Sequence, residues 1–289
     1  MRKFILSAFV LFFSISVSAQ VNFYEGDWRE VNKLASAQDK MIMLKAYTDW
    51  CHWCKVMEND VFTDPAVAKS LNNGFISVKM NFEEEEAISL AAKFRVMGYP
   101  TILFFNSQGQ LVKKVSGYRD VEQFLYDIKM ARTAPEKYAF DATNLQVEFP
   151  DFYLKSFGPK ETREYPDPEL VAEYLNNQKD LFSEATWSVM YRFELTEKLQ
   201  MFFLQNHERF AAMYGTYEVE NKINNIIRQR IKSAAKQYDE KMLQEALKLV
   251  DQHFPKDAKT TKLQLQLNYY QTTKNWEQVA KLMGIYLSL

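Results

Sequence analysis

The sequence predicts an α/β fold with a mixed, helix-flanked sheet, followed by an all-α helical region. Apolar runs of strand length alternate with segments of helical period over roughly the first 132 residues. The last two runs flank a short turn, so an antiparallel hairpin closes a sheet that begins with parallel strands. After a proline-rich stretch, only helical periodicity remains. With 289 residues, 47% of them hydrophobic, both parts can bury a core.

The elements of the first part follow one another with short connections. Met41–Tyr47 is a nearly continuous apolar run, which is typical of a strand buried on both faces. Asp64-Pro65 is a helix start, and Ser107-Gln108-Gly109 is the turn of the hairpin. The predicted order is a helix at 27–38, a strand at 41–47, helices at 51–62 and 65–71, a strand at 75–82, a helix at 83–94, strands at 101–105 and 111–115, and a helix capped by Asp120 that runs to about 132.

Composition changes after this first part. Five of the eight prolines fall between Pro135 and Pro168, which predicts a linker or an irregular docking segment over 135–167. Asp167 and Pro168 then form an N-cap and N1 pair, and a helical domain is predicted over 168–289. Short connections indicate antiparallel helix pairs. The predicted helices are 168–180, 185–204, 206–214, 217–237, 239–252, 258–272 and 275–288.

The first 19 residues have the features of a secretory signal peptide. Arg2 and Lys3 precede an apolar run from Phe4 to Val17, and Val17-Ser18-Ala19 is a small-residue cleavage site before Gln20. An uncleaved anchor is the alternative. Cleavage would remove two positive charges and change the net charge from −1 to −3. We therefore expect an exported protein, and a mature N-terminal domain that spans 20–134.

The chain has two cysteines, Cys51 and Cys54, in the run Trp50-Cys51-His52-Trp53-Cys54. Structural disulfides of exported proteins usually join loops that are distant in sequence, and no further cysteine is available for that. A Cys51–Cys54 bond closes a ring of four residues, which restricts the unfolded chain little. Thiol–disulfide exchange is therefore favoured over a stabilising role, and Cys51 would lie where helix N–H groups stabilise a thiolate.

A strand ending in this Trp-Cys-x-x-Cys run, a helix, and then Gly98-Tyr99-Pro100-Thr101 before the third strand resemble the thioredoxin superfamily over about residues 25–132. The Trp-Cys-His-Trp-Cys-Lys-Val-Met-Glu run is most similar to the exported thiol–disulfide branch. The resemblance implies a thioredoxin-like fold with Cys51 as the exposed nucleophile and Cys54 as the resolving thiol. It also implies that Pro100 is a cis-proline facing the cysteines, which would leave the Tyr99 backbone able to pair with an extended substrate. An ordinary trans proline at the start of an edge strand is the alternative for Pro100.

Three aromatic side chains surround the thiols. Protonated His52 would stabilise the Cys51 thiolate, whereas a solvated His52 would have little effect. Trp50 and Trp53 would provide an apolar surface for an unfolded substrate, or simply pack the rim of the site.

One position departs from the pattern of the family. The thioredoxins carry a buried Asp six residues before the first Cys, where it accepts the proton of the second thiol, and this chain has Lys45 there. Glu58 is four residues after Cys54 and shares its helix face. We expect Glu58 to take over the proton-transfer role with Lys45 as its partner, joined by Lys79 on the neighbouring strand. Otherwise Lys45 would extend to solvent and Glu58 would be an exposed helix residue.

The chemistry of the chain favours one class of function over others. A net charge of −1 argues against nucleic-acid binding. Three scattered histidines give no zinc set, so no metal or cofactor is expected. Glu83–Glu86 is interpreted as a solvated helix start. The sequence predicts an exported protein-disulfide oxidoreductase, in a bacterial periplasm, that exchanges electrons with protein disulfides or dithiols and with a membrane or periplasmic redox partner. A non-catalytic module that binds a partner or client is the alternative.

Overall fold

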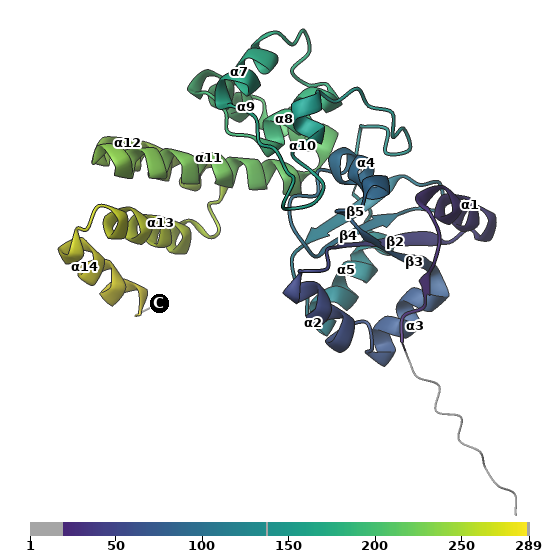
Figure 1. Ribbon diagram of the computed structural model, residues 1–289. Helices are drawn as coiled ribbons and strands as arrows, with labels where there is room; N and C mark the ends of the chain where they lie inside the picture. The colour runs from purple at the N-terminus through teal and green to yellow at the C-terminus, as the bar shows by residue number, and fades with distance from the viewer. Residues whose placement is uncertain (1–19, 137, 288–289) are drawn as a thin grey trace, which may run out of the picture.

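The computed structural model describes residues 20–136 and 138–287, so the predicted signal peptide lies outside the described residues (Figure 1). A five-stranded sheet with the order β1-β3-β2-β4-β5 forms the centre of the N-terminal half. Its strands are β1 (Phe23–Tyr24), β2 (Met41–Tyr47), β3 (Phe75–Asn81), β4 (Thr101–Phe105) and β5 (Leu111–Ser116). The two-residue strand β1 was not predicted, because it is too short to show a periodic pattern.

The sheet is mixed in the way the sequence predicts. β3 pairs in parallel with both β1 and β2, whereas β4 pairs antiparallel with β2 and β5. In the β2–β3 register Lys45 is opposite Lys79. The carboxyl end of β2 and the start of β4 therefore lie at the same edge of the sheet, since Ala46 pairs with Thr101.

Helices cover both faces of this sheet. On one face α2, α3 and α5 pack against Met43, Ile102 and Phe104. On the other face α1 and α4 pack against Leu44 and other alternate strand residues, and this core continues into the C-terminal helices. The helices are α1 (Trp28–Gln38), α2 (His52–Asp60), α3 (Pro65–Gly74), α4 (Glu85–Lys93) and α5 (Val121–Thr133).

Side-chain caps fix where three of these helices begin. The Asp27 side chain accepts from Glu30 N, and the Asp64 side chain accepts from Ala66 N and Val67 N. Asp120 forms a capping box with Gln123. These caps are readable in the sequence, and the predicted starts agree with the observed ones to within a residue.

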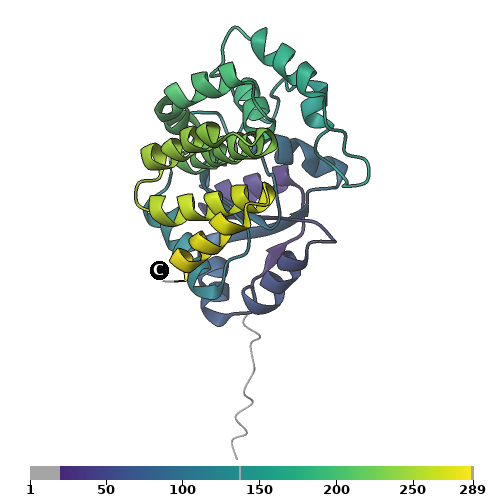
Figure 2. The same cartoon turned by 90° about the vertical axis from the view of Figure 1, so that its left-hand side faces the viewer.

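The C-terminal half is helical, and α11–α14 extend away from the sheet as an arm (Figures 1 and 2). The single helix predicted over 185–204 is wrong, because the backbone is extended at Phe193 and Thr196 and divides it in two. Periodicity continues across this break without a Gly or Pro to mark it. The observed helices are α7 (Pro168–Asn176), α8 (Glu184–Arg192), α9 (Glu197–Gln205), α10 (His207–Tyr214), α11 (Thr216–Gln237), α12 (Glu240–His253), α13 (Ala258–Thr272) and α14 (Trp276–Tyr286).

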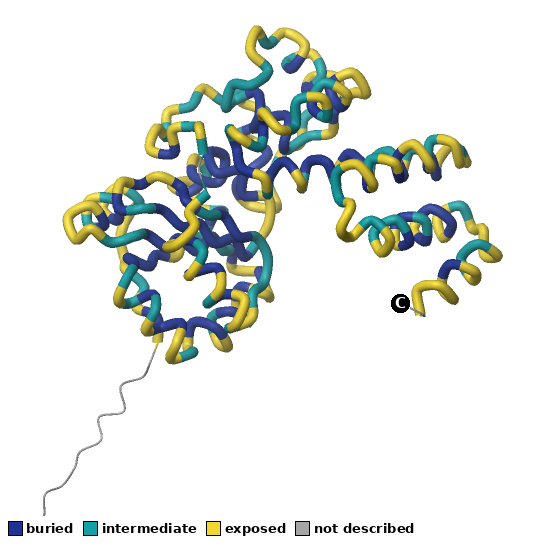
Figure 3. The backbone as a smooth tube through the Cα atoms, turned by 180° about the vertical axis from the view of Figure 1, so that it is seen from behind, coloured by how far each residue is buried: buried dark blue, intermediate teal, exposed yellow. Residues whose placement is uncertain are grey.

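The proline-rich segment between the two halves packs against the sheet domain. It contains one short unpredicted helix, α6 (Asp151–Leu154), and α6 contacts α4. Tyr153 is fully buried, and its hydroxyl donates to Ala92 O at 2.7 Å. Burial of residues continues from the strands into the near end of α11 (Figure 3).

A buried ion network joins the helical half to the sheet domain. Glu218 on α11 accepts from Arg95 Nε at 2.7 Å and from Lys114 Nζ on β5 at 2.8 Å. Trp187 Nε1 also donates to Glu218, at 3.1 Å. Each of these four side chains is at most about 5% exposed, so the network is a fixed contact and not a surface salt bridge.

Candidate active site

The two cysteines lie at the edge of the sheet where β2 ends and α2 begins. They form a disulfide, and Cys51 is the N-cap of α2. The Cys54 N–H points to Cys51 Sγ at 3.1 Å. Cys51 therefore faces the unpaired N–H groups of the first turn, which stabilise negative charge.

Exposure of the thiols differs from the expectation for Cys51. Cys51 is 4% exposed and Cys54 is 2% exposed, so both are buried in the disulfide form. Cys51 Sγ is bonded to Cys54 Sγ and also accepts from Cys54 N, so it lies against the first turn of α2. The expected exposed nucleophile is not seen in this oxidised structure.

The segment that precedes β4 contains the expected cis bond, between Tyr99 and Pro100. Pro100 O accepts from Gly117 N at 2.8 Å, and Thr101 Oγ1 donates to Gly98 O at 2.7 Å. These bonds fix the segment at the edge of the sheet that also carries the dithiol. Burial raises the pKa of Tyr99 to about 12, despite the opposing charge of Arg163.

Trp50, His52 and Trp53 form the outer rim of the site. Trp50 and Trp53 are each about half exposed, at 52% and 53%. The Trp50 ring meets Tyr99 edge-on at 6.1 Å, and the Trp53 ring lies 5.3 Å from His52. The rim therefore presents exposed aromatic side chains beside the disulfide.

The structure brings Lys45 and Glu58 together behind Cys54. Lys45 is fully buried, and its Nζ lies 2.6 Å from Glu58 Oε1 and 3.2 Å from Cys54 O. Lys79 Nζ lies 3.9 Å from the same carboxylate oxygen. Burial lowers the pKa of Lys45, although the hydrogen bond and the charge of Glu58 oppose this shift. Glu58 has a side chain that is 36% exposed, so it connects the buried ammonium to solvent.

Glu83 is a site residue that the sequence analysis missed. It was interpreted as part of a solvated helix start, but α4 begins at Glu85 and the Glu83 side chain is only 12% exposed. Its carboxylate accepts from Trp50 Nε1 at 2.8 Å and from Arg163 Nη2 at 2.8 Å. Arg163 lies 80 residues further along the chain, and no local pattern in the sequence indicates such a contact.

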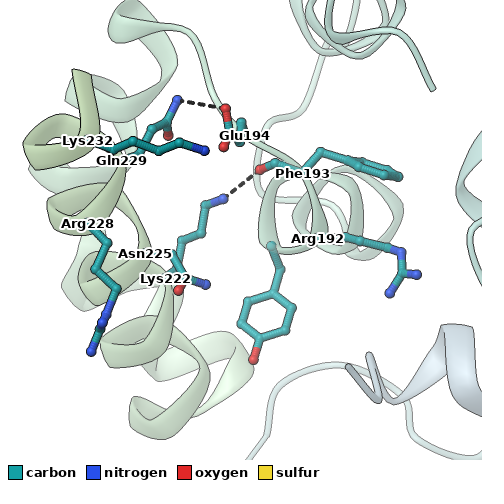
Figure 4. A pocket seen from close by; sticks show the side chains of 9 residues that line it. Arg192, Phe193, Glu194, Lys222, Asn225, Arg228, Gln229 and Lys232 are labelled. Atoms are coloured by element: carbon teal, nitrogen blue, oxygen red, sulfur yellow. Dashed lines mark hydrogen bonds between the residues drawn. The ribbon is translucent and has the colours of Figure 1, made fainter. Parts of the chain in front are cut away.

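A separate cavity of about 270 Å³ lies along α11 (Figure 4), and neither cysteine lines it. Its lining includes the buried Lys222, whose Nζ donates to Phe193 O at 2.7 Å. Within residues 20–136 and 138–287, no group of three or more His, Cys, Asp or Glu residues is arranged to hold a metal ion. The helices of the same residues include none with the length and apolarity needed to cross a membrane.

Comparison with known proteins gives similarity over the sheet domain. Residues 11–106 match the family model Thioredox_DsbH, described as "Protein of unknown function, DUF255". The thiol:disulfide interchange protein DsbD of Yersinia pestis is 40% identical over 99 residues, which are 33% of this chain and 17% of that protein. DsbD of Escherichia coli K12 is 37% identical over 99 residues, 33% of this chain and 18% of that protein. The chain thus spans about a sixth of the length of these relatives.

Solved structures show similarity to about two fifths of the chain. A putative disulphide-isomerase from Bacteroides thetaiotaomicron is 33% identical and covers 40% of this chain and 97% of its own, with a TM-score of 0.38. A DsbH oxidoreductase is 20% identical and covers 40% of this chain and 88% of its own, with a TM-score of 0.35.

Proposed function

Because residues 11–106 match the Thioredox_DsbH family model, and Cys51 and Cys54 form a disulfide at the start of α2, we propose that the protein is a thiol–disulfide oxidoreductase of the thioredoxin superfamily that acts on protein substrates. The observation that carries the proposal is the position of the disulfide. The disulfide closes a ring of only four residues. It lies at the N-terminus of α2, beside an exposed aromatic rim. A disulfide that stabilises the fold acts by closing a longer loop, and it requires neither a helix N-terminus nor an exposed aromatic rim.

The exchange follows from the order of the two thiols. In the reductive direction the Cys51 thiolate attacks a substrate disulfide, forms a mixed disulfide and releases one substrate thiolate. Cys54 then loses its proton and attacks Cys51 Sγ, which restores the Cys51–Cys54 disulfide and releases the second substrate thiolate. Two electrons pass from the protein to the substrate. In the oxidative direction a substrate thiolate attacks the Cys51–Cys54 disulfide and the same steps run in reverse.

The N-terminus of α2 would lower the pKa of the Cys51 thiol. Cys51 is the N-cap, so the N–H groups of the first turn face its sulfur. A thiolate at this position attacks disulfides at neutral pH. In the oxidative direction Cys51 is also a good leaving group, when the second substrate thiolate attacks the substrate sulfur of the mixed disulfide.

Glu58 would accept the proton of Cys54 through its contact with Lys45. The Lys45 ammonium lies between Cys54 O and Glu58, and the carboxylate reaches solvent. A solvent-connected carboxylate can take up a proton during resolution and release it afterwards. His52 would tune the Cys51 thiolate from the exposed side of the helix.

We propose the reductive or interchange direction, in a bacterial periplasm. The basis for export is the sequence of residues 1–19, with its basic start, apolar run and small-residue cleavage site. A reductase in that compartment needs an electron supply, so a membrane or periplasmic redox partner would re-reduce the Cys51–Cys54 disulfide.

The test combines the thiol pKa of Cys51 with trapping of the intermediate. We expect the alkylation rate of the reduced Cys54→Ser variant to report a Cys51 pKa well below the usual value of about 8.5. We also expect this variant to accumulate a mixed disulfide with a test protein that contains a disulfide. The Cys51→Ser variant should form none. A pKa near 8.5 with no reduction of any test disulfide would contradict the proposal and favour a partner-binding module.

A further inference from the structure

The segment from Ser156 to Tyr165 lies against the active-site rim, although it belongs to the predicted linker. Arg192 holds its start, because Nη2 donates to Ser156 O and Nη1 points to Met97 Sδ at 3.1 Å. Arg163 closes the segment on itself by donating to Gly158 O at 2.8 Å. The segment is therefore bound to the loop that carries the cis-proline.

Glu83 connects this segment to the tryptophan that precedes Cys51. Its carboxylate accepts from Lys160 N at 2.9 Å, from Arg163 Nη2 and from Trp50 Nε1. The Lys160 ammonium also lies 5.5 Å from the Trp50 ring centre. Trp50 is thus held by Glu83, which is bound in turn by residues more than a hundred positions from Trp50 in sequence, and the segment forms a wall beside the dithiol.

A cavity of about 90 Å³ lies between this wall and the cis-proline loop. It is lined by Met97, Tyr99, Arg163, Tyr165 and Arg192, together with further apolar and small residues. A single water needs about 10–15 Å³ of such space, so a carboxylate with some water fits. No residue lining the cavity is acidic.

Arg192 is the unusual member of this cavity. Its Nε is buried and has no hydrogen-bond partner among the described residues. Within residues 20–136 and 138–287, no carboxylate forms a salt bridge with its guanidinium, whereas Arg163 already pairs with Glu83. Arg192 also lines the α11 cavity, and Figure 4 shows its side chain directed away from Lys222. A partly buried cation without a counter-charge favours an anion that enters from outside.

We propose that the wall formed by residues 156–165 makes the oxidoreductase selective for substrates with an acidic side chain near the reactive cysteine, and that Arg192 receives this side chain. The proposal rests on the proposed function, because the cavity opens beside the Tyr99–Pro100 segment next to the dithiol. The occupant is an extended peptide, and the exposed side chains of Tyr165 in the cavity lining and of Trp50 on the rim would contact it. Arg192 would be a specificity-determining residue, and the exchange chemistry itself would not require it.

The test uses peptides with one cysteine as a mixed disulfide with the neutral leaving group 2-thiopyridine. Glu or the isosteric Gln is placed in turn at each of the four positions on either side of the cysteine, since four extended residues span about 13 Å. Attack by reduced Cys51 releases thiopyridone, and the second-order rate constant is measured. At one or more positions we expect Glu peptides to react about five-fold faster than Gln peptides, and the ratio to fall at about 0.5 M salt.

The variant Arg192→Gln should bring this ratio close to one. Lys155→Gln is the matched control. Lys155 is a cation of the same region, but it pairs with Glu164 outside the cavity, so this variant should keep the wild-type ratio of Glu to Gln peptide rates. All three proteins should react equally with 2,2′-dithiodipyridine, which has no peptide. Equal rates for Glu and Gln peptides at every position would overturn the selectivity while leaving the proposed function intact. Absence of reaction with any disulfide would instead overturn the proposed function.

Discussion

The contact between Lys45 and Glu58 was predicted from a single departure from a known sequence pattern. Finding Lys at the position of a family Asp led to the expectation of a charge partner on α2, and the two head groups lie 2.6 Å apart. The prediction was possible because helix periodicity places Glu58 on the face of Cys54. The role of the pair in proton transfer stays a prediction.

Glu58→Gln should slow the resolution of the mixed disulfide by about ten-fold near neutral pH, because the variant has no carboxylate to accept the Cys54 proton. The loss should diminish as the pH rises and Cys54 ionises without help. Stopped-flow measurement of mixed-disulfide decay against pH provides the rate. Asp60→Asn is the matched control, since Asp60 is exposed on the same helix. An unchanged pH profile in Glu58→Gln would exclude this role.

Lys222 should give the folded protein a pH-dependent stability. Burial lowers the pKa of Lys222 from 10.5 to about 7, although the charge of Glu194 opposes the shift. Between these values the unfolded chain binds a proton that the folded chain does not, so its contribution makes the free energy of unfolding rise with pH. Lys222→Met removes this contribution, so its free energy of unfolding should depend less on pH between about pH 7 and 9. Its gain in stability over wild type should be largest at or below pH 7.

Urea unfolding at several pH values measures this effect. Lys232→Met is the control, because Lys232 is an exposed lysine on the same helix and lines the same cavity (Figure 4). If wild type and Lys222→Met have parallel profiles, Lys222 has an ordinary pKa and the explanation is wrong.

At the scale of elements, local signals explain most of what could be predicted. Strand β2 was predicted from a continuous apolar run. The helix starts were predicted from caps at Asp27, Asp64 and Asp120, because these signals involve only residues that are neighbours in sequence. The break between α8 and α9 was missed, since no Gly or Pro marks it. The contact of residues 156–165 with the active-site rim was also missed, because it depends on pairs such as Glu83 and Arg163 that are 80 residues apart.

Gly158 should determine the path of this 156–165 segment. It adopts a left-handed φ of +88°, and a Cβ there would lie 3.3 Å from Ile88 Cδ1. Gly158→Ala should therefore cost about 1–2 kcal/mol of stability and lower the preference for acidic peptides. Gly109→Ala is the control, as Gly109 also has a positive φ but lies in the β4–β5 turn. Thermal unfolding and the peptide rates measure both effects. Retained selectivity in Gly158→Ala would show that this conformation does not position the wall.

At the scale of the whole molecule, the buried network around Glu218 couples the helical half to the sheet domain. Burial alone would raise the pKa of Glu218, but the charges of Arg95 and Lys114 hold it below its usual range. The network contributes stability above the ordinary Glu pKa, and this contribution is lost as the pH falls through the lowered value. Nothing in the sequence indicated the pairing, because Glu218 is more than a hundred residues from both Arg95 and Lys114.

Glu218→Gln should destabilise the protein by about 3–5 kcal/mol at neutral pH, because Arg95 and Lys114 then remain buried without a counter-charge. Urea unfolding followed by tryptophan fluorescence measures the loss. Glu220→Gln, two residues further along α11 and exposed, should stay within about 0.5 kcal/mol of wild type. A loss of similar size in both variants would contradict this explanation of the contact between the two halves.

The central claim is that Cys51–Cys54 is a reversible redox couple. Equilibration of the protein with graded mixtures of reduced and oxidised dithiothreitol or glutathione, followed by quenching and separation of the two forms, gives its reduction potential. We expect a single two-electron transition between about −270 and −120 mV, the range of thiol–disulfide exchange proteins. A disulfide that stays closed to below about −300 mV, as structural disulfides do, would contradict the claim.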